Sequence, residues 1–476
     1  MTHSVFAPGL ESVTVAETEL SRVDGQSGEF CVRGYPIEEL AANATYEEVV
    51  YLLFHGRLPT ETERAESRAD LAGRRGVDDA VETVLRRAAG ERCPPMDAVR
   101  MGVAAASLGA DAEDPLAVAK RVVAVVPTVV ATYWRYRDGD DPVAPDPELG
   151  HAANYLYMLR GERPTEAEVE GVETFLTTAV DHGLNPSTFT ARTVVSTESD
   201  LVSAATAAVG TVKGPRHGGN LKAVDETLRA AHESGDPDAF VRQRVEADGE
   251  LPGFGHRVYR VRDPRAAVMA AACERLSATD SEDLLLTARA VEAAGVEHLR
   301  ERRPGRPIAA TLEFYAVALL GGVGVPRDLL TATFAVSRVG GWMAHSLEQL
   351  EEAEVVRPVS RYVGETDRSW TPAGERASDG VGRSSLEPVS ETLAVLAEPA
   401  RLEILVALAD ADAPVAYSSL RSATTVDDKG RFNYHLRKLR GSFVTERGEG
   451  YTLTETGERL VETVLTDDRL LDTAFD

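Results

Sequence analysis

The stretch AVDHGLNPSTFTAR, residues 179–192, ends one helical pattern with His182 and continues into a Gly-Leu-Asn-Pro turn. Apolar residues precede His182 at helical spacing. A histidine at the end of a helix is often only a favourable cap. It can also bind a ligand at the turn, and this stretch alone leaves both interpretations open.

Three more clusters contain a histidine or a carboxylate that could have either a structural or a functional role. TVKGPRHGGN places His217 on a Gly-rich turn, where small residues let a ligand approach the backbone. LPGFGHRVYRVRDPR places His256 after two glycines and before several arginines, and ATLEFYAVAL has Glu313 at the start of an apolar helix. Each has a purely structural explanation, but together they could supply acid and base groups for proton abstraction next to a carbonyl.

Arginines near these clusters are candidate carboxylate ligands. Arg265, Arg338 and Arg357 could each bind a carboxylate through two parallel hydrogen bonds, although a single arginine in an Arg-rich chain can equally be a surface residue. No HExxH pattern occurs, and the three cysteines are scattered. A metal site is therefore not expected.

The sequence around these clusters, residues 1–360, consists of one helical pattern after another. Thr165–His182, Leu201–Val212 and Arg327–Leu350 have apolar residues at helical spacing, with glycine and proline between them. Alternating strand patterns occur mainly near Glu11–Tyr35. The expected fold class is mainly α.

The sequences of these clusters resemble those of the citrate synthase family, and the resemblance extends over about residues 7–365. The resemblance is carried, in order, by GLESVTVAETELSRVDG, VRGYPIEELA, DHGLNPSTFTAR, GPRHGG, GFGHRVYRVRDPRA, FAVSRVGGWMAHSLEQ and the RP of VVRPVSRYVG. It implies a helical enzyme with a large and a small domain that works as a homodimer. The family domain would span residues 1–363, with the small domain at about residues 219–324.

The resemblance also implies roles for individual residues. The oxaloacetate carboxylates would be held by His182, Arg265, Arg338 and, from the partner subunit, Arg357. His256 would protonate the ketone oxygen, Glu313 would take a proton from the methyl group of acetyl-CoA, and His217 would hydrogen-bond the thioester oxygen. The loop expected to bind CoA consists of Leu251, Pro252, Gly253, Phe254 and Gly255.

Some neighbours of these residues depart from the family pattern. The family base is usually aspartate in Pro-Asn-Val-Asp-Phe-Tyr, whereas this chain has Glu313 within Ala310–Tyr315. The extra methylene moves the carboxylate by roughly a bond length, and a displacement of ~1 Å can cost ~100-fold in rate. Beside His217, Arg216 and Asn220 replace smaller neutral residues. All seven ligand and catalytic positions nevertheless keep a competent residue type.

The C-terminal part of the chain has a different pattern. Residues 364–384 are rich in Gly, Ser and charge, which predicts a flexible linker. Residues 385–476 predict short helices and then a hairpin at Ser442–Thr454, which together make a small α+β module. LAEPARLEILVALAD and GRFNYHLRKL resemble the opening and recognition helices of winged helix-turn-helix domains in archaeal transcription regulators.

The predicted recognition helix, Asp428–Arg440, has five basic residues and no acidic residue after Asp428. Phe432, Leu436 and Leu439 would face a core. Side chains suited to phosphates and base edges in a DNA major groove lie elsewhere on the helix. They are Arg431, Asn433, Tyr434, Arg437, Lys438 and Arg440. The alternative is a module used only for dimerisation or protein contact.

Composition sets the remaining limits. The 476 residues suffice for two or three domains, and the net charge is −26 with only five lysines. This balance fits a protein kept soluble at very high salt, although an ordinary acidic cytosolic protein is the alternative. The N-terminus has no basic or apolar signal-peptide region, and no uncharged apolar run reaches a membrane span. We expect a cytoplasmic protein.

The sequence therefore predicts an acyltransferase of the tricarboxylic acid cycle type. It would condense acetyl-CoA or propionyl-CoA with oxaloacetate to give citrate or 2-methylcitrate, with no cofactor beyond the acyl-CoA substrate. Its partners would be a second copy of the chain and, through the fused module, DNA. The alternative is a metabolite-sensing transcription regulator with a citrate synthase body and weak or no turnover.

Overall fold

A computed structural model describes the chain as two compact units, residues 1–359 and 360–476. We call them unit 1 and unit 2 and treat each by itself. The described residues are 6–10, 13–106, 114–248, 250–255, 259, 261–276, 282–303, 305, 308–352, 354–366, 368–370, 372, 394–411, 413–448 and 450–461.

Unit 1 begins with a short 3-10 turn, η1 (Pro8–Leu10), and a small antiparallel sheet. The sheet has the order β1 (Ser21–Asp24), β2 (Glu29–Val32) and β3 (Tyr35–Pro36). Phe30 and Val32 alternate with less buried residues on β2, as expected for a strand with one face on a core. The strands fall within or beside the region in which the sequence predicted them.

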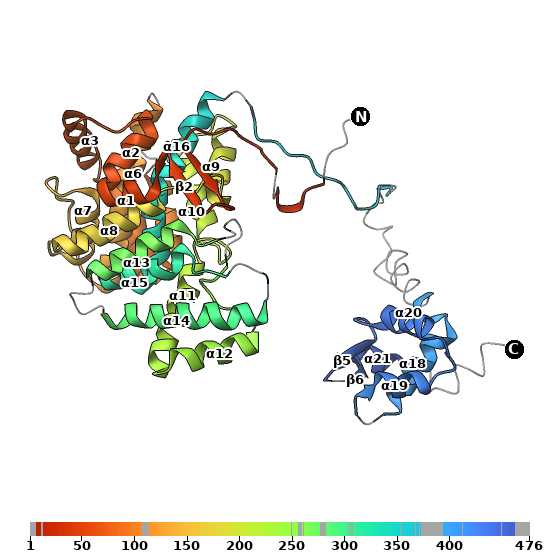
Figure 1. The fold of residues 1–476 in the computed structure, drawn as a ribbon. Coiled ribbons are helices and arrows are strands. Elements are labelled where there is room, and N and C mark those ends of the chain that lie inside the picture. The colour runs from red at the N-terminus through yellow and green to blue at the C-terminus, as the bar shows by residue number, and fades with distance from the viewer. Residues whose placement is uncertain are drawn as a thin grey trace. The chain divides into compact units, whose positions relative to one another are not determined.

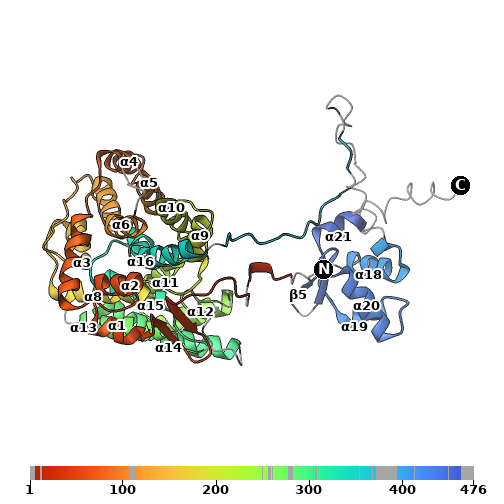
Figure 2. The same ribbon diagram turned by 90° about the horizontal axis from the view of Figure 1, so that it is seen from above.

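The rest of unit 1 is helical, which confirms the predicted fold class. Figures 1 and 2 show α16 surrounded by other helices. It packs against α6, α8, α9 and α10, and nearly all of its residues from Leu330 to Ser346 are buried. The helices of this part are α1 (Ile37–Asn43), α2 (Tyr46–His55), α3 (Glu61–Gly73), α4 (Asp79–Gly90), α5 (Pro95–Ala105), α6 (Pro115–Asp138), α7 (His151–Arg160), α8 (Glu166–Ala179), α9 (Pro186–Val195), α10 (Leu201–Val212) and α16 (Leu330–Glu351).

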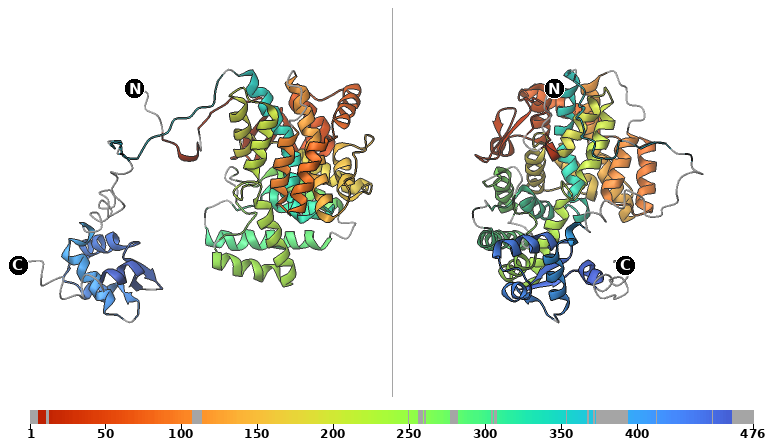
Figure 3. Two further views of the ribbon diagram at one scale, coloured as in Figure 1. Left: turned by 180° about the vertical axis from the view of Figure 1, so that it is seen from behind. Right: turned by 90° about the vertical axis from the view of Figure 1, so that its right-hand side faces the viewer.

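Between α10 and α16 the chain forms a second group of helices. Figures 1 and 3 show α12 and α14 side by side at one end of unit 1, where α11, α13 and α15 connect them to the large group. The bounds are α11 (Asn220–Ser234), α12 (Pro237–Asp248), α13 (Pro264–Leu276), α14 (Glu282–Arg302), α15 (Leu312–Gly322) and η2 (Arg327–Leu329). The small domain predicted at residues 219–324 covers this group, and its boundaries remain a prediction.

One helix in the described part of the chain, α6, has the length and mean hydropathy to cross a membrane. Most of it is buried against α4, α5, α7 and α16. Its apolar character is therefore explained by its place in the core.

Unit 2 contains helices and a three-stranded antiparallel sheet of order β4-β6-β5. The predicted hairpin is confirmed as β5 paired with β6, and the predicted core face Phe432, Leu436 and Leu439 is buried. Most of the predicted linker at residues 364–384 lies outside the described residues. The elements are α18 (Pro399–Ala409), β4 (Val415–Ala416), α19 (Tyr417–Ser422), α20 (Lys429–Leu439), β5 (Val444–Arg447), β6 (Gly450–Leu453) and α21 (Glu455–Leu460).

Candidate active site

The turn that carries His182 joins α8 to α9. Asn185 caps α9 by accepting hydrogen bonds from the backbone N–H groups of Ser187 (3.1 Å) and Thr188 (3.2 Å). Asp181, which is fully buried, accepts hydrogen bonds from the Ser21 hydroxyl of β1 and from the backbone N–H of Gly183 at 3.0 Å. These bonds fix the backbone on both sides of His182.

Two consecutive glycines bring α16 against this turn. A Cβ atom on Gly341 would lie 2.4 Å from the carbonyl oxygen of Val180 and 2.9 Å from Oδ1 of Asp181. A Cβ atom on Gly340 would lie 3.0 Å from the hydroxyl of Tyr46. The close approach requires residues without side chains, and it sets Arg338, two residues earlier on α16, near Asp181.

Arg338 is buried, and its guanidinium lies 4.7 Å from the ring centroid of Phe334. Among the described residues, its Nε has no hydrogen-bond partner and no carboxylate forms an ion pair with it. Burial lowers the pKa of Arg338 to about 10, and the negative charge of Asp181 offsets part of this effect. The side chain is therefore a buried cation at neutral pH with unused hydrogen-bonding capacity.

Asp181 stays ionised in spite of its burial. Burial acts to raise its pKa, but His345 and the hydrogen bonds to the carboxylate outweigh this, so the pKa lies well below its usual range. Nε2 of His345 lies 3.3 Å from Oδ1 of Asp181. On its other side, Nδ1 of His345 is 3.3 Å from a guanidinium nitrogen of Arg192.

His217 is held by a hydrogen-bonded chain. Its Nε2 lies 2.8 Å from the hydroxyl of Ser187, which accepts a hydrogen bond from the indole N–H of Trp342 at 3.0 Å. The same hydroxyl is 2.8 Å from Oδ1 of Asn185. Burial, and then the positive charge of Arg338, lower the pKa of His217 to about 4. His217 is therefore neutral at physiological pH.

Arg265, at the start of α13, is also buried but is fully paired. Its guanidinium donates to both carboxylate oxygens of Asp263, at 3.0 and 2.9 Å. Burial acts to lower the pKa of Arg265, but the Asp263 carboxylate outweighs this and raises it above its usual value. Asp263 also accepts a hydrogen bond from the backbone N–H of Leu312, which connects Arg265 to the first turn of α15.

Glu313 lies in that first turn and is partly exposed. The predicted CoA loop, Leu251–Gly255, runs beside the residues that precede it. Gly255 donates from its backbone N–H to the carbonyl oxygen of Ala309 (3.1 Å), and Thr311 donates to that of Gly253 (2.9 Å). Gly253 has a φ of 83°, and a Cβ atom there would lie 2.9 Å from the Phe314 ring. The loop therefore needs glycine at this position.

Charge effects indicate which predicted residues lie close together. The pKa of Arg338 is influenced by Asp181, Arg265 and Glu313, and that of His217 by Arg338. Residues from the turn after α8 and from α13, α15 and α16 therefore contribute to one electrostatic environment. Its two buried guanidiniums and neutral imidazole suit a dianion with a carbonyl group.

Two predicted residues are not part of this arrangement as described. His256 lies outside the described residues. Arg357 is exposed on an extended segment, where the backbone N–H of Val356 donates to the Ser196 hydroxyl at 3.1 Å. Within a single chain, no contact joins Arg357 to the other predicted ligands among the described residues.

Several residues of the site were not singled out from the sequence, among them Asp181, Ser187, Tyr259, Asp263 and Trp342. Each lies inside one of the motifs that carried the resemblance. Asp181 could have been noticed as a carboxylate directly before His182. Nothing in the sequence indicates that Trp342 reaches Ser187, since that contact spans 155 positions.

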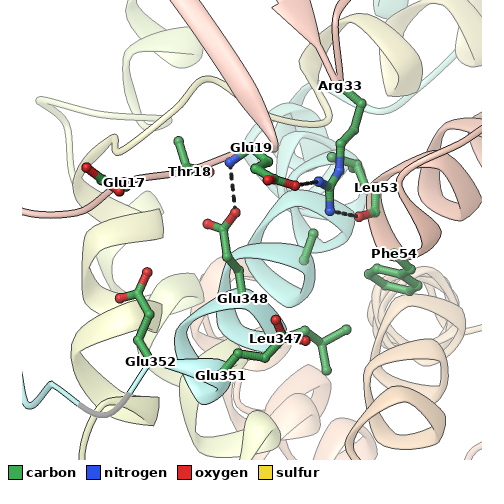
Figure 4. A pocket seen from close by; sticks show the side chains of 11 residues that line it. Glu17, Thr18, Glu19, Arg33, Leu53, Phe54, Leu347, Glu348, Glu351 and Glu352 are labelled. Atoms are coloured by element: carbon green, nitrogen blue, oxygen red, sulfur yellow. Dashed lines mark hydrogen bonds and ion pairs between the residues drawn. The ribbon is translucent and has the colours of Figure 1, made fainter.

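A separate cavity of about 350 Å³ lies between the N-terminal segment and the end of α16 (Figure 4). Its lining includes Arg33 and the carboxylates of Glu17, Glu19, Glu348, Glu351 and Glu352. Glu19 pairs with Arg33 at 3.1 Å, and Glu348 accepts a hydrogen bond from the backbone of Glu19 at 2.9 Å. None of the residues predicted from the sequence lines it, and its excess of carboxylates is unsuited to an anionic substrate.

In unit 2, the residues predicted to contact DNA are all exposed on α20 and at its end. Several have partners already: Arg431 is 3.7 Å from Glu398, Arg440 is 2.9 Å from Glu446, and Asn433 accepts a hydrogen bond from Tyr417. Among the described residues, Arg437 and Lys438 have no ion-pair partner. Lys438 lies 6.0 Å from the ring centroid of Tyr434.

The described residues contain no group of three or more His, Cys, Asp or Glu side chains placed to hold a metal ion.

Comparison with known proteins relates unit 1 to one family. A family model described as citrate synthase, C-terminal domain, matches residues 9–359. A citrate synthase of Haloferax volcanii is 44% identical over 380 residues, which cover 77% of this chain and 98% of that protein. A 2-methylcitrate synthase of Mycobacterium tuberculosis is 37% identical over 367 residues, covering 76% and 91%.

Solved structures give the same result. A citrate synthase from Pyrobaculum aerophilum is 35% identical with a TM-score of 0.69, covering 78% of this chain and 95% of that one. A ternary complex of the Thermoplasma acidophilum citrate synthase with carboxymethyl coenzyme A and oxaloacetate is 28% identical with a TM-score of 0.70, covering 78% and 100%. Residues 389–464, in unit 2, match a domain of unknown function, DUF7347.

Proposed function

We propose that this chain, which belongs to the citrate synthase family and is an enzyme of the citrate or 2-methylcitrate synthase type, uses acetyl-CoA as its acyl donor and oxaloacetate as its acceptor. The 44% identity to the Haloferax volcanii citrate synthase supports acetyl-CoA. The 37% identity to the 2-methylcitrate synthase is no lower than the 35% identity to the Pyrobaculum aerophilum citrate synthase, so the thiol-release assay below decides between acetyl-CoA and propionyl-CoA. The reaction requires no cofactor beyond the acyl-CoA substrate.

Oxaloacetate binding is the step for which the charge distribution offers the strongest support. We assign its carboxylates to His182, Arg265 and Arg338 of one subunit and to Arg357 of the partner subunit. The observation that carries this proposal is the buried guanidinium of Arg338, which has unused donors and no ion-pair partner among the described residues. A carboxylate would supply both the hydrogen bonds and the countercharge that this side chain lacks.

The condensation begins with removal of a proton from the methyl carbon of acetyl-CoA by Glu313. The thioester oxygen, on which negative charge develops, accepts a hydrogen bond from neutral His217. For Nδ1–H of His217 to be that donor, Ser187 must give its hydroxyl proton to Nε2 rather than to Asn185. The indole N–H of Trp342 occupies a lone pair of the Ser187 oxygen, so the hydroxyl has its single proton to give either to Nε2 of His217 or to Oδ1 of Asn185, both at 2.8 Å.

The enol carbon then forms a bond to the ketone carbon of oxaloacetate, and the ketone oxygen takes a proton. Following the family resemblance, we assign that proton to His256. Water finally attacks the thioester carbonyl carbon, the carbon–sulfur bond breaks, and CoA leaves as its thiol. Because the base and the CoA loop lie on a different helical group from His182 and Arg338, closure of the two groups would exclude water until condensation is complete.

The CoA loop is assigned to Leu251–Gly255. The backbone bonds that join Gly253 and Gly255 to Thr311 and Ala309 support this assignment, because they place the loop beside the helix start that bears Glu313. A groove of about 420 Å³ continues from Ala309 past Arg262 and Arg300. Glu292 also lines this groove and lies 3.6 Å from Arg262, so Arg300 is the guanidinium that suits a phosphate of CoA.

The central test is release of CoA thiol by purified protein at molar KCl, with acetyl-CoA and propionyl-CoA each offered with oxaloacetate. We expect turnover with a higher kcat/KM for acetyl-CoA. Glu313→Gln should lower kcat by about 100- to 10,000-fold. Glu61→Gln, at an exposed first-turn position of α3, is the matched control and should keep full activity. A preference for propionyl-CoA would reassign the donor, and retention of activity in Glu313→Gln would reject Glu313 as the base.

The assignment of Arg357 requires a dimer in which each chain donates this residue to the other. Its exposure on an extended segment supports a position away from its own chain's core. Sedimentation at molar KCl should give a dimer. Mixing inactive Arg338→Met and Arg357→Met chains should restore about a quarter of wild-type activity if the site is shared. Half of the dimers are then mixed, and each mixed dimer has one intact site out of two. Absence of restoration would place Arg357 outside the shared site.

We propose high-salt solubility for the same protein, on the basis of its net charge of −26 and only five lysines. Cytoplasmic location remains a prediction from the sequence. Activity and unfolding temperature should both rise between low and molar KCl. A protein that is fully active and stable at low salt would contradict this expectation.

For unit 2 we propose DNA binding through α20. The order of three helices followed by a β hairpin supports a winged-helix arrangement. Arg437 and Lys438, which form no ion pair within the described part of unit 2, support contacts to phosphates or base edges. The pairing of Arg431 and Arg440 with carboxylates reduces the charge available, so specific binding would rely on the centre of the helix. KCl at molar concentration would further weaken the contacts between these basic side chains and DNA phosphates.

Selection from a random duplex library, followed by fluorescence anisotropy at several KCl concentrations, tests this proposal. We expect an enriched sequence, and about tenfold or greater loss of affinity in the double variant Arg437→Ala/Lys438→Ala. Arg86→Ala/Arg87→Ala, which removes the same charge from α4 of unit 1, is the matched control. Failure to enrich any sequence would favour a protein-contact role. DNA binding by a protein without thiol release would favour the metabolite-sensing alternative.

A further inference from the structure

Tyr259 contacts two of the side chains to which we assign oxaloacetate. Its hydroxyl lies 3.2 Å from Nε2 of His182, and its ring centroid is 5.6 Å from that of the imidazole. The guanidinium carbon of Arg265 lies 5.9 Å from the same Tyr259 centroid. Tyr259 is 2% exposed, so these contacts are shielded from solvent.

A second aromatic ring contacts the same pair. The ring of Phe30, on β2, lies 5.5 Å from the imidazole of His182, and Arg265 is 5.8 Å from the Phe30 centroid. His182 and Arg265 therefore share two aromatic neighbours. Phe30 can only support them by packing, whereas Tyr259 also supplies a hydrogen bond.

The hydroxyl of Tyr259 is suited to fix the imidazole. Burial raises the pKa of Tyr259 above its usual value, so the phenol keeps its proton across the physiological range. A neutral imidazole has one N–H and one acceptor nitrogen, and a hydrogen bond at Nε2 determines both the ring orientation and which nitrogen carries the proton. Loss of the hydroxyl would leave the ring free to turn over.

We propose that Tyr259 is a positioning residue for oxaloacetate: its hydroxyl orients His182, and its ring supports the guanidinium of Arg265. This inference rests on the proposed function, since it assigns the substrate carboxylates to His182 and Arg265. Tyr259 acts through these two side chains rather than on the reacting atoms.

The role should be confined to one substrate. The loop assigned to CoA is fixed by backbone bonds to Ala309 and Thr311, and these do not involve the hydroxyl of Tyr259. Removing that hydroxyl should therefore change oxaloacetate binding and leave acyl-CoA binding unchanged. A side chain needed only for packing would affect neither substrate when tyrosine is replaced by phenylalanine.

The experiment compares Tyr259→Phe with the wild type and with Tyr133→Phe, a control in α6 that loses a buried tyrosine hydroxyl bonded to the carbonyl oxygen of Cys93. Steady-state kinetics at molar KCl give both KM values, and calorimetry gives the Kd for oxaloacetate. In Tyr259→Phe we expect the oxaloacetate KM and Kd to rise about five- to tenfold. The acyl-CoA KM should stay within about twofold. In Tyr133→Phe neither KM should change.

Two results would overturn the inference: an unchanged oxaloacetate Kd in Tyr259→Phe, or equal rises in both KM values. The unfolding temperature of each variant shows whether a rise reflects general destabilisation, in which case Tyr133→Phe should show it too. If the wild type binds oxaloacetate without turnover, the Kd values still decide. If the wild type does not bind oxaloacetate at all, the proposed function fails, an outcome visible before any variant is compared.

Discussion

Arg338 on α16 and Arg265 on α13 have the same predicted role and the same 2% exposure, yet their surroundings are opposite. Arg265 is clamped through two hydrogen bonds by Asp263, and its pKa is raised. Arg338 has no ion pair among the described residues, and its pKa is lowered to about 10. One guanidinium is neutralised by a carboxylate of the fold, and the other has no carboxylate in ion-pair contact among the described residues.

Because of this difference, we expect the two arginines to contribute to oxaloacetate binding in different ways. A buried cation without a partner destabilises the folded chain, and an anionic ligand that pairs with it recovers this free energy as affinity. A cation that already has a carboxylate contributes less affinity but is held in a fixed position. We therefore expect Arg338 to supply most of the binding free energy and Arg265 to supply geometry.

The largest effect should be the loss of stability on removing Arg265, the arginine that is paired with Asp263. Arg265→Met leaves Asp263 as a buried charge without its partner, and such changes cost about 3–5 kcal/mol of stability. Urea unfolding at molar KCl measures the loss. Restoring neutrality with the double variant Arg265→Met/Asp263→Asn should recover part of it. A single variant as stable as the wild type would show that the Asp263 pair is not a structural requirement.

Arg338→Met should have the opposite profile. Oxaloacetate affinity should fall by about 100-fold or more, because the unpaired guanidinium is lost. The unfolding temperature should stay the same or rise, since an unpaired buried charge is replaced by an apolar side chain of similar length. Calorimetry and thermal unfolding measure the two quantities. A fall in stability as large as that of Arg265→Met would remove the contrast between the two arginines.

The close approach that places Arg338 can be tested at Gly341. Gly341→Ala would bring a Cβ atom within 2.4 Å of a backbone oxygen, and we expect a loss of about 1–3 kcal/mol with a higher oxaloacetate KM. Gly210→Ala is the matched control in α10, where the nearest atom would be 3.6 Å away. That control should be neutral or stabilising by up to about 1 kcal/mol. Equal effects of the two variants would argue against a special role for the α16 contact.

The smallest effect concerns the pKa of His217, which is lowered by burial and by the positive charge of Arg338. Its pKa of about 4 lies below the ordinary 6.5, so between these values the unfolded chain binds a proton that the folded chain does not. Stability should therefore fall as pH falls through this window. NMR titration of the imidazole in Arg338→Met should give a higher pKa than in the wild type. An identical pKa would show that burial alone causes the shift.

Helices and motifs could be predicted well because their signals are local. The apolar spacing of α8, α10 and α16 depends on residues a few positions apart. The resemblance then indicated His182, His217, Glu313 and Arg338 as site residues. The contacts that control their protonation could not be predicted, since Trp342 and Ser187, or His345 and Asp181, are joined only by packing between helices.

The helical class, the family and the residue types of the candidate site can be predicted from the sequence, because periodicity and motifs are properties of short segments. The pairing of the two arginines follows from the folded structure. Asp263 is two residues from Arg265 and caps the same turn, whereas the carboxylate with the largest effect on the pKa of Arg338, that of Asp181 in the turn between α8 and α9, is engaged with Ser21, Gly183 and His345. Which charges are neutralised inside a protein depends on distances across the core, and those are set by packing.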